Sequence, residues 1–412
     1  MNPPAANTMP SRSVLVAGGG IGGLATALAC ARAGCQVSLL EQATAFSEVG
    51  AGIQLGPNAV RVLQSLGVGP ALAHVAARPS RLEVRNALSA DVLGTLPLGD
   101  VALSRYGADY FTVARADLQD LLLRAVRAHE GVALHLQTAL QAVEQDANGV
   151  RVHTAQSDAP HAQASIDATA TMEAHALIGA DGLWSRVRHA VCGDAPPRVT
   201  GHLAYRAMVP QNQLPAHLRS QLVTAWMGPD FHAVQYPVRG GEWLNVVVIV
   251  HGSVRGDHTG WDYQANAADL RGRLHNAAAP LRELLLAIDA WRLWPLFDRP
   301  PMASAAEHVR GRVALIGDAA HPMRPYLAQG AGMAIEDAAA LAASLSAHPG
   351  DVPTALQVFA AQRWQRNARV QARAIRNGEI FHLQGPMRWG RDMALRALGK
   401  HLLDVPWLYA GP

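Results

Sequence analysis

Three glycines near the N-terminus, Gly18, Gly20 and Gly23, have the G-x-G-x-x-G spacing of a turn that binds a pyrophosphate. The apolar residues 13–17 precede them and a helical pattern follows, so we expect a strand, a tight turn and a helix. In such a unit the glycines permit the turn, close approach of the backbone to phosphates and tight helix-on-strand packing. Glu41 ends the next expected strand, about twenty residues further on, where a carboxylate can accept hydrogen bonds from ribose hydroxyls. The pattern indicates a dinucleotide, either FAD or NAD; a turn that binds no ligand is the alternative.

Two further stretches could contribute to the same site. Residues 49–58 form a second glycine-rich passage before a helix, and Gly52 in it would let the backbone lie close to a flat ligand. Arg115 stands at the N-terminal end of the helical stretch 118–129, where its guanidinium could reach a phosphate. A surface or capping arginine is the alternative there.

Two buried strands later in the chain also end at acidic residues. Residues 176–179 run into Asp181, and residues 312–316 run into Asp318, each before a helical stretch. For Asp181 a turn-forming role is the alternative to ligand binding, and for Asp318 a helix-capping role.

Composition limits the class of protein. The 412 residues exceed one typical core, so we expect two closely associated domains. Lys and Arg outnumber Asp and Glu by only 35 to 32 and are scattered, which argues against a nucleic-acid partner. The three cysteines form no C-x-x-C pair and are expected to be apolar fillers in a reducing compartment. The apolar runs are too short for a membrane span and the N-terminus does not resemble a signal peptide, so we predict a short disordered lead and a cytoplasmic protein.

The pattern of the chain changes after about residue 197. Four β-like runs separated by Gly, Pro and Asp indicate an antiparallel sheet inserted into an α/β chain: residues 202–209, 221–228, 231–238 and 243–251. Residues 265–290 are predicted to form a helical layer over this sheet, and residues 155–174 an irregular excursion. The chain after residue 330 is predicted to be mostly helical.

Three motifs taken together, in this order and spacing, resemble those of the single-component FAD-dependent aromatic hydroxylases. They are residues 18–23 with Glu41, the segment Gly179-Ala180-Asp181-Gly182, and the segment Gly317-Asp318-Ala319-Ala320-His321-Pro322. The flavoprotein monooxygenases of this family are built like p-hydroxybenzoate hydroxylase. Within the family, residues 321–337 look most like salicylate, 3-hydroxybenzoate and 6-hydroxynicotinate hydroxylases.

The resemblance selects FAD over NAD and implies roles for single residues. Asp318 would accept hydrogen bonds from the ribityl hydroxyls, Arg115 would lie near the phosphates, and Asp181 would serve both FAD and a passing nicotinamide cofactor. Pro325 would help form a wall beside the flavin ring, and the helix start at Gly330 and Gly332 would stabilise negative charge on the reduced ring. The predicted cofactor-binding residues are Gly18, Gly20, Gly23, Glu41, Gly52, Arg115, Asp181, Asp318, Pro325, Gly330 and Gly332.

The resemblance also sets the expected architecture. We predict an α/β fold in which a Rossmann-like FAD-binding domain, residues 11–75, 105–195 and 295–345, is discontinuous. Residues 76–104 and 196–294 are predicted to form an inserted antiparallel β-sheet domain that binds substrate, and residues 346–412 a helical C-terminal region. No second dinucleotide motif is evident, so NADH or NADPH is expected to dock transiently.

The inserted sheet contains the candidates for chemistry on a substrate. Strand alternation puts His232 and Tyr236 on one face, roughly 13 Å apart, where they could flank a bound ring. A histidine's pKa suits a base that deprotonates a phenol, although a histidine merely satisfied inside the sheet is the alternative. Tyr326 is a plausible third contact to substrate, and Arg206 could bind a carboxylate or form a structural ion pair. His321 is expected to support the cofactor loop.

The predicted function is hydroxylation of a small phenolic acid by an FAD monooxygenase that uses NAD(P)H and O2. The resemblance implies a flavin C4a-hydroperoxide as the species that delivers oxygen, with 3-hydroxybenzoate or salicylate ahead of 6-hydroxynicotinate as substrate. Hydroxylation or epoxidation of a polycyclic substrate, and a non-catalytic FAD-binding redox protein, are the alternatives. We expect no metal, no nucleic acid and no membrane partner, and a monomer or homodimer.

Overall fold

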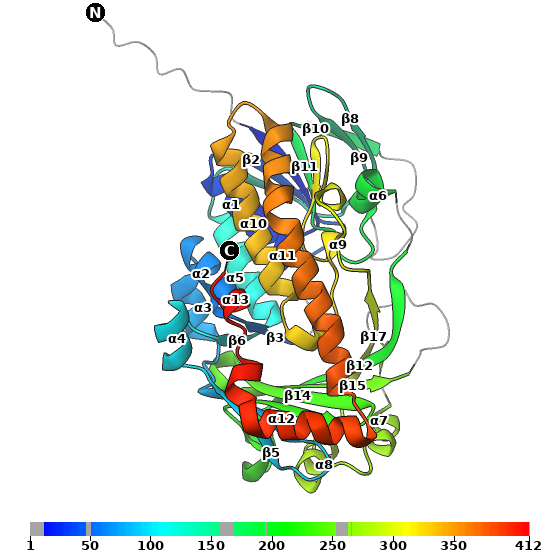
Figure 1. The fold of residues 1–412 in the computed structure, drawn as a ribbon. Coiled ribbons are helices and arrows are strands. Elements are labelled where there is room, and N and C mark those ends of the chain that lie inside the picture. The colour runs from blue at the N-terminus through cyan, green and yellow to red at the C-terminus, as the bar shows by residue number, and fades with distance from the viewer. Residues whose placement is uncertain are drawn as a thin grey trace, which may run out of the picture.

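The computed structural model describes residues 12–46, 51–156, 169–193, 196–252, 263–264 and 266–411 (Figure 1). The predicted lead at residues 1–10 lies outside them. The N-terminal motif opens a six-stranded sheet with the strand order β18-β19-β11-β1-β2-β7. Its strands are β1 (Ser13–Ala17), β2 (Gln36–Leu40), β7 (Val132–His135), β11 (Ala176–Gly179), β18 (Val309–Arg310) and β19 (Val313–Leu315). All pairings are parallel except that of β18 with β19, as expected for a Rossmann-like sheet.

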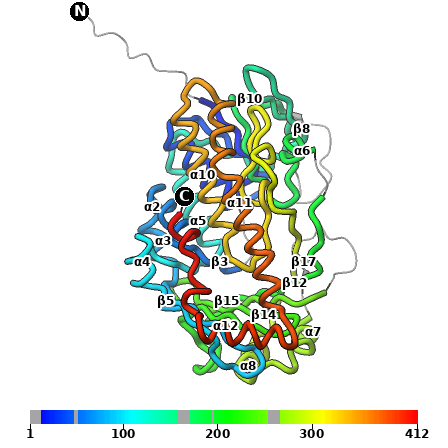
Figure 2. Tube along the Cα trace, in the orientation of Figure 1, coloured from blue at the N-terminus to red at the C-terminus, as the bar shows by residue number. Residues whose placement is uncertain are grey.

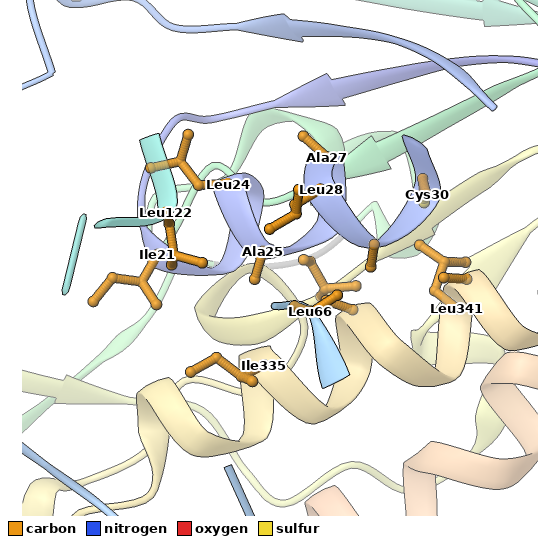
Figure 3. Packing of buried hydrophobic residues seen from close by; sticks show 14 of the residues in the cluster. Ile21, Leu24, Ala25, Ala27, Leu28, Cys30, Leu66, Leu122, Ile335 and Leu341 are labelled. Atoms are coloured by element: carbon orange, nitrogen blue, oxygen red, sulfur yellow. The ribbon is translucent and has the colours of Figure 1, made fainter. Parts of the chain in front are cut away.

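Helix α1 (Ile21–Arg32) is buried on most sides, because small residues let it pack closely on its neighbours. Figure 3 shows Ile21, Leu24 and Leu28 of α1 in one apolar cluster with Leu122 and Ile335. These last two residues come from α5 (Arg115–Arg127) and α10 (Gly330–Ala347). The C-terminal part of the chain therefore returns to complete the core around the opening motif.

Two smaller sheets lie beside this core. Strands β3 (Gly52–Leu55) and β6 (Phe111–Ala114) pair antiparallel, and β8 (Thr138–Gln145), β9 (Val150–Gln156) and β10 (Thr169–Ala174) form a three-stranded sheet. The predicted irregular excursion at 155–174 is therefore wrong at both ends: 169–174 pairs in register with β9, and residues 155–156 belong to β9 itself. Met172 packs on a buried cluster and Glu173 pairs with Arg151, which stabilises the strand. Residues 157–168 lie outside the described part of the chain.

The inserted sheet has eight strands in the order β16-β17-β12-β15-β14-β13-β4-β5. They are β4 (Arg81–Asn86), β5 (Val92–Pro97), β12 (Arg198–Pro210), β13 (Val223–Gly228), β14 (Phe231–Val238), β15 (Trp243–His251), β16 (Tyr263–Gln264) and β17 (Arg292–Asp298). The expected antiparallel sheet is in fact mixed, because β13 pairs parallel with β4. This parallel pair arises because β4 comes from an earlier segment of the chain and joins the edge of the later strands.

One face of the inserted sheet is covered by α7 (Ala267–Arg273) and α8 (Ala279–Leu286). Tyr205 and Val246 of the sheet share a buried cluster with Leu270 and Leu281 of these helices. The helical layer predicted at 265–290 is thus two helices, broken before Pro280. A proline fits the first turn of a helix but not its interior, so it marks a new start.

The C-terminal helices join the two main sheets. Helix α11 (Val352–Phe381) runs beside α10 and on toward the inserted sheet, where α12 (Gly385–Leu403) crosses β5 (Figures 1 and 2). Gly399 lies so close to Gly94 that a Cβ on it would be 3.0 Å from the Gly94 Cα. The α/β fold with an inserted sheet and a helical C-terminus is confirmed.

The remaining helices are shorter. They are α2 (Pro57–Ser65), α3 (Gly69–Val75), α4 (Asp100–Tyr106), α6 (Arg186–Cys192), α9 (Gly317–Ala320) and α13 (Pro406–Tyr409), with 3-10 turns η1 (Gln211–Gln213), η2 (Ala216–Leu218), η3 (Arg239–Gly241), η4 (Ala305–Glu307) and η5 (Pro325–Leu327). Among the described residues, no helix combines the length and apolar character needed to cross a membrane.

Candidate active site

The glycine turn is held by contacts that leave no room for larger side chains at two of its three glycines. Gly18 adopts φ +103°, and a Cβ there would lie 2.4 Å from the Ala180 carbonyl oxygen. A Cβ at Gly23 would lie 1.8 Å from the Gly18 oxygen, so α1 can approach β1 only with glycine at this position. Gly20 is the N-cap of α1, and a Cβ on it would meet no atom within 4 Å. The first and last glycines thus allow close packing, while the middle one borders open space at a helix N-terminus, where phosphates are stabilised.

Glu41 helps to order this turn. Its carboxylate accepts hydrogen bonds from the backbone N–H of Gly19 (2.7 Å) and of Ala43 (2.8 Å). A carboxylate has about four lone-pair positions, so these two bonds leave capacity for ribose hydroxyls. Glu41 could therefore still bind a ribose as predicted. Its hydrogen bonds to the turn are a structural role that the sequence did not indicate.

The other end of the expected FAD site lies where α9, α10 and α5 begin. Asp318 is exposed in the first turn of α9, and a Cβ on Gly330 would lie 3.9 Å from its Oδ1. Arg115 is the first residue of α5 and lies within electrostatic range of Asp318. Gly332 lies in the first turn of α10, beside the Gln329 side chain. The structure therefore gathers four of the residues predicted to bind FAD at neighbouring helix starts.

Asp181 and Gly52 have contacts that the sequence did not predict. The Asp181 carboxylate accepts hydrogen bonds from the Arg186 N–H (2.8 Å) and the Val187 N–H (3.1 Å), so it orders the start of α6. The Gly52 N–H donates to Asn245 Oδ1 at 2.7 Å, and a Cβ on Gly52 would be 2.6 Å from the Tyr236 ring. In the described structure these contacts are intramolecular, and the roles of both residues toward a cofactor stay predictions.

A buried ionic network supports the loop that follows Asp318. Asp337 accepts a hydrogen bond from the Gly317 N–H at 3.1 Å and is paired with His321 and Arg363. Burial alone would raise the pKa of Asp337, but the charges of His321 and Arg363 outweigh it and hold this pKa well below its ordinary value. Arg363 also pairs with Glu336 at 2.7 Å. The predicted supporting role of His321 fits these contacts.

Tyr326 and Pro325 are held in place by helix α11. Asn377 Nδ2 donates to the Tyr326 carbonyl oxygen at 3.1 Å, and a Cβ on Gly378 would be 2.6 Å from the Tyr326 ring. Pro325 begins η5, next to Tyr326. Among the described residues the Tyr326 hydroxyl has no hydrogen-bond partner, and burial raises the pKa of this tyrosine. A polar group that is buried without a partner is a natural contact for a ligand.

His232 faces the same space as Tyr326. Its ring centroid is 5.0 Å from that of Tyr326 and 5.3 Å from that of Phe381. His232 is buried, and burial, together with the neighbouring His382 and His202, holds its pKa well below the ordinary value. Nε2 of His232 has no hydrogen-bond partner among the described residues, whereas Nδ1 is 2.8 Å from His382 Nε2. One nitrogen is therefore available for a substrate hydroxyl.

Tyr236 lies on the same strand face as His232 but in different surroundings. It is buried in an apolar cluster with Val238 and Met333 and contacts Gly52. No ring contact joins it to His232 within the described structure, so the structure brings His232 together with Tyr326 rather than with Tyr236. Burial raises the pKa of Tyr236.

Arg206 provides a cation on this face of the sheet. Its guanidinium lies 4.7 Å from the Trp294 ring centroid and makes neither a hydrogen bond nor an ion pair with any described residue. Burial lowers the pKa of Arg206 to about 10, so it remains charged near neutral pH. The alternative role of Arg206, a structural ion pair, is therefore absent from the described part of the chain.

Strand register places Arg206 in a row with three partly exposed apolar residues. Arg206 lies opposite Val247, which lies opposite Val234, which lies opposite Ala225. All four are half-buried, whereas Ile249 and His232 in the adjoining row are buried. This row is a partly exposed apolar strip with a cation at one end.

The sequence did not single out three further histidines that form a cluster beside His232. His382 Nδ1 is 3.2 Å from His251 Nε2, and His202 lies opposite His251 on β12 with ring centroids 4.4 Å apart. One nitrogen from each of His202, His251 and His382 lies within 4.8 Å of the others. Knowledge of the β12–β15 pairing would have brought His202 and His251 together, but no sequence pattern pointed to His382.

Comparisons with known proteins show the family of this chain. Residues 11–375 match the family described as FAD binding domain. A 3-hydroxybenzoate 6-hydroxylase of Polaromonas naphthalenivorans is 37% identical over 398 residues, covering 96% of this chain and 95% of that protein. A 6-hydroxynicotinate 3-monooxygenase of Bordetella bronchiseptica is 35% identical over 365 residues, covering 87% of this chain and 89% of that protein. A salicylate hydroxylase solved as a substrate complex is 27% identical with a TM-score of 0.80, covering 97% of this chain and 95% of that one. The chain belongs to the single-component FAD-dependent aromatic hydroxylases.

Proposed function

We propose that this protein is an NAD(P)H- and O2-dependent FAD monooxygenase that hydroxylates a small phenolic acid, with 3-hydroxybenzoate as the first candidate. The observation that carries the proposal is that one face of the inserted sheet presents both a buried histidine and an arginine that has no ion-pair partner among the described residues. A phenol needs a base and a carboxylate needs a cation, and His232 and Arg206 provide one of each.

The separation of these two residues suits a single aromatic ring. Their strands are two positions apart in the sheet, and His232 is two residues from Val234, which shares a row with Arg206. Strand spacing and rise then put the two Cα atoms roughly 12 Å apart. Both side chains extend from the same face, so the gap between their ends would accommodate one benzene ring and its substituents. The polycyclic alternative needs a larger space than this pair would leave.

Different residues of this chain would bind the substrate, deprotonate it and exclude water from it. FAD, once bound and reduced by NADH or NADPH, supplies the chemistry that activates O2. Arg206 would hold the carboxylate, and His232 Nε2 would take the phenolic proton, which makes the ring more electron-rich. Val234, Val247 and Ala225 would exclude water from the ring.

The choice among substrates follows the relatives. The named proteins act on 3-hydroxybenzoate and 6-hydroxynicotinate and are 37% and 35% identical to this chain, and the salicylate hydroxylase is 27% identical. These identities support 3-hydroxybenzoate ahead of salicylate and 6-hydroxynicotinate. We further propose that residues 76–104 and 196–294 bind the substrate, that the protein acts in the cytoplasm as a monomer or homodimer, and that its thiols stay reduced, since all three cysteines are free.

One screen tests the proposal. Purified holoenzyme is mixed with NADH or NADPH and each aromatic acid in turn, and nicotinamide oxidation, H2O2 and organic product are measured together. We expect 3-hydroxybenzoate to stimulate oxidation and to yield a dihydroxybenzoate. Oxidation that yields only H2O2 with every acid would contradict the substrate class, and an absence of substrate-stimulated oxidation would favour a non-catalytic flavoprotein.

His232→Ala tests the assignment of the base. General-base catalysis contributes about 100-fold or more, so we expect product formed per second to fall by about that factor. FAD content should not change, because His232 lies on the inserted sheet, away from the glycine turn. His217→Ala, at an exposed histidine of the same sheet domain, is the matched control. An unchanged product yield per NADH in His232→Ala would refute the assignment.

A further inference from the structure

A chain of three imidazoles leads from the buried site to the protein surface. His232 Nδ1 is 2.8 Å from His382 Nε2, and His382 Nδ1 is 3.2 Å from His251 Nε2. His232 and His382 are buried, whereas His251 is exposed at the end of β15. The two contacts use opposite nitrogens of the middle ring, so the chain passes through His382 without a break.

The three rings can adopt one consistent set of tautomers. If each neutral ring carries its hydrogen on Nδ1, then His232 donates to His382, His382 donates to His251, and the Nδ1–H of His251 is left for solvent. Nε2 of His232, which has no partner among the described residues, is then an acceptor facing the proposed substrate position. In this set of tautomers each hydrogen bond points outward, so the rings are ready to pass a proton from His232 toward solvent.

We propose that His382 and His251 form a relay that carries the phenolic proton from His232 to solvent. The relay rests on the proposed function, because it requires a phenolic substrate at His232. The phenol O–H bond breaks and its proton binds His232 Nε2, while the Nδ1 proton of each ring passes to the next acceptor and His251 releases its own to water. Each imidazole ends neutral with its hydrogen on Nε2, and the charge left behind is the substrate phenolate.

The surroundings explain why a relay is needed rather than one histidine. Burial, together with His202 and His251, lowers the pKa of His382 to about 3, and burial with His251 and Arg324 lowers that of His202 to about 4. Arg391 adds positive charge near His382, and Asp298, which pairs with Arg324, is the acidic group near His202. An imidazolium stored at these positions is therefore costly, whereas a concerted transfer leaves no charged ring.

A bound metal ion is the competing interpretation of the same cluster. His202, His251 and His382 could each offer one nitrogen, and the buried Nδ1 of His202 has no partner among the described residues. A metal on His382 Nδ1 would replace the hydrogen that the relay passes to His251, so the two interpretations exclude each other. The distances favour the relay, because both ring–ring contacts are already within hydrogen-bond range.

The exposed end of the chain offers the sharpest test. Stopped-flow mixing of oxidised holoenzyme with 3-hydroxybenzoate, with a pH indicator in dilute buffer, measures the rate at which the phenolic proton reaches solvent. We expect His251→Ala to slow this release about 10-fold or more, and added imidazole to restore it by filling the vacated position. His275→Ala removes another exposed histidine of the same domain and should change neither rate.

A second variant keeps a hydrogen bond but removes the proton shuttle. In His382→Gln the amide can still contact His232, yet it cannot accept a proton at one atom and release another at the next. We expect slow release that imidazole does not restore, with normal FAD content, the substrate dissociation constant nearly unchanged and kcat lowered. Solvent deuterium should slow release in the wild type more than in either variant.

The outcomes separate the relay from the function on which it rests. A wild-type enzyme that turns over none of the acids would overturn the proposed function and the relay with it. A wild-type enzyme that hydroxylates 3-hydroxybenzoate while His251→Ala releases protons at the same rate, with or without imidazole, would overturn the relay alone. Stoichiometric zinc in the purified protein, with proton release altered by its removal with a chelator, would replace the relay with a metal site.

Discussion

Arg206 gives the most direct test of how the site recognises its substrate. Its guanidinium has an aromatic neighbour, Trp294 at 4.7 Å, but no described anion, and burial already lowers its pKa. A guanidinium that has lost water and has no anion beside it is stabilised more by a bound carboxylate than a fully hydrated guanidinium is, because no other group compensates for the lost water. Arg206→Met removes the charge and keeps an apolar stem of similar length against Trp294.

The size of the effect follows from the kind of interaction removed. A hydrogen bond to a charged group contributes about 1.5–3 kcal/mol, which corresponds to roughly 10- to 150-fold in Kd. Arg206→Lys keeps the charge but removes the planar guanidinium that matches a carboxylate, so its loss of substrate affinity should be smaller than that of Arg206→Met. The substrate's phenol and ring contacts are untouched in both variants.

The assay compares an acid with its neutral amide. The Kd of oxidised holoenzyme for 3-hydroxybenzoate and for 3-hydroxybenzamide is read from the change in flavin absorbance. Arg206→Met should raise the Kd for the acid by the factor given above and leave the Kd for the amide nearly unchanged. The preference of the site for the acid should therefore disappear. Arg282→Met, at an exposed position on α8, controls for loss of one positive charge. Equal weakening of acid and amide would refute the reasoning, because it would show that Arg206 supports the sheet rather than the carboxylate.

Two further substitutions test the cofactor end of the molecule. Gly23→Ala should abolish FAD retention after gel filtration, because its Cβ would lie 1.8 Å from the Gly18 oxygen; FAD retained at wild-type stoichiometry would contradict this. Arg363→Met should lower the free energy of unfolding in urea by about 3–5 kcal/mol because it leaves Asp337 buried without its guanidinium, whereas exposed Arg376→Met should have little effect. The depressed pKa of Asp337 stabilises the wild type fully above the ordinary value of 3.8, and this stabilisation declines as pH falls from 3.8 toward the lower native pKa. The variant's deficit should therefore shrink on acidification, and a deficit independent of pH would refute the electrostatic account.

Much of the fold could be predicted because its signals are local. The spacing of Gly18, Gly20 and Gly23 between an apolar run and a helical pattern already contains the strand, turn and helix. The alternation along 231–238 likewise predicted that His232 and Tyr236 share a strand face. The predictions went wrong where pairing with another strand decides the structure: β4, from an earlier part of the chain, makes the inserted sheet mixed, and β9 pairs with 169–174 as a strand.

The site was less predictable, because its members meet only through tertiary packing. Alternation predicted that His232 and Tyr236 flank a bound ring, but it could not show that the side chains next to His232 are those of Tyr326 and His382. Both come from the C-terminal quarter of the chain, in a loop and at a helix end without a repeating pattern. Arg206 could be singled out by its type, but its lack of an ion-pair partner among the described residues depends on the packing of the sheet and could not be predicted.

Helix α11 links the cofactor end of the site to the substrate end. Arg363 in its middle pairs with Asp337, which holds the Gly317 N–H beside Asp318, and His382 directly follows its last residue. At 1.5 Å per residue the helix separates Arg363 from His382 by about 28 Å. Between them Asn377 fixes the Tyr326 backbone at 3.1 Å. One rigid element thus sets the distance between the loop at Asp318 and the proposed base His232, so α11 would align the distant sheet face with an FAD held at the glycine turn.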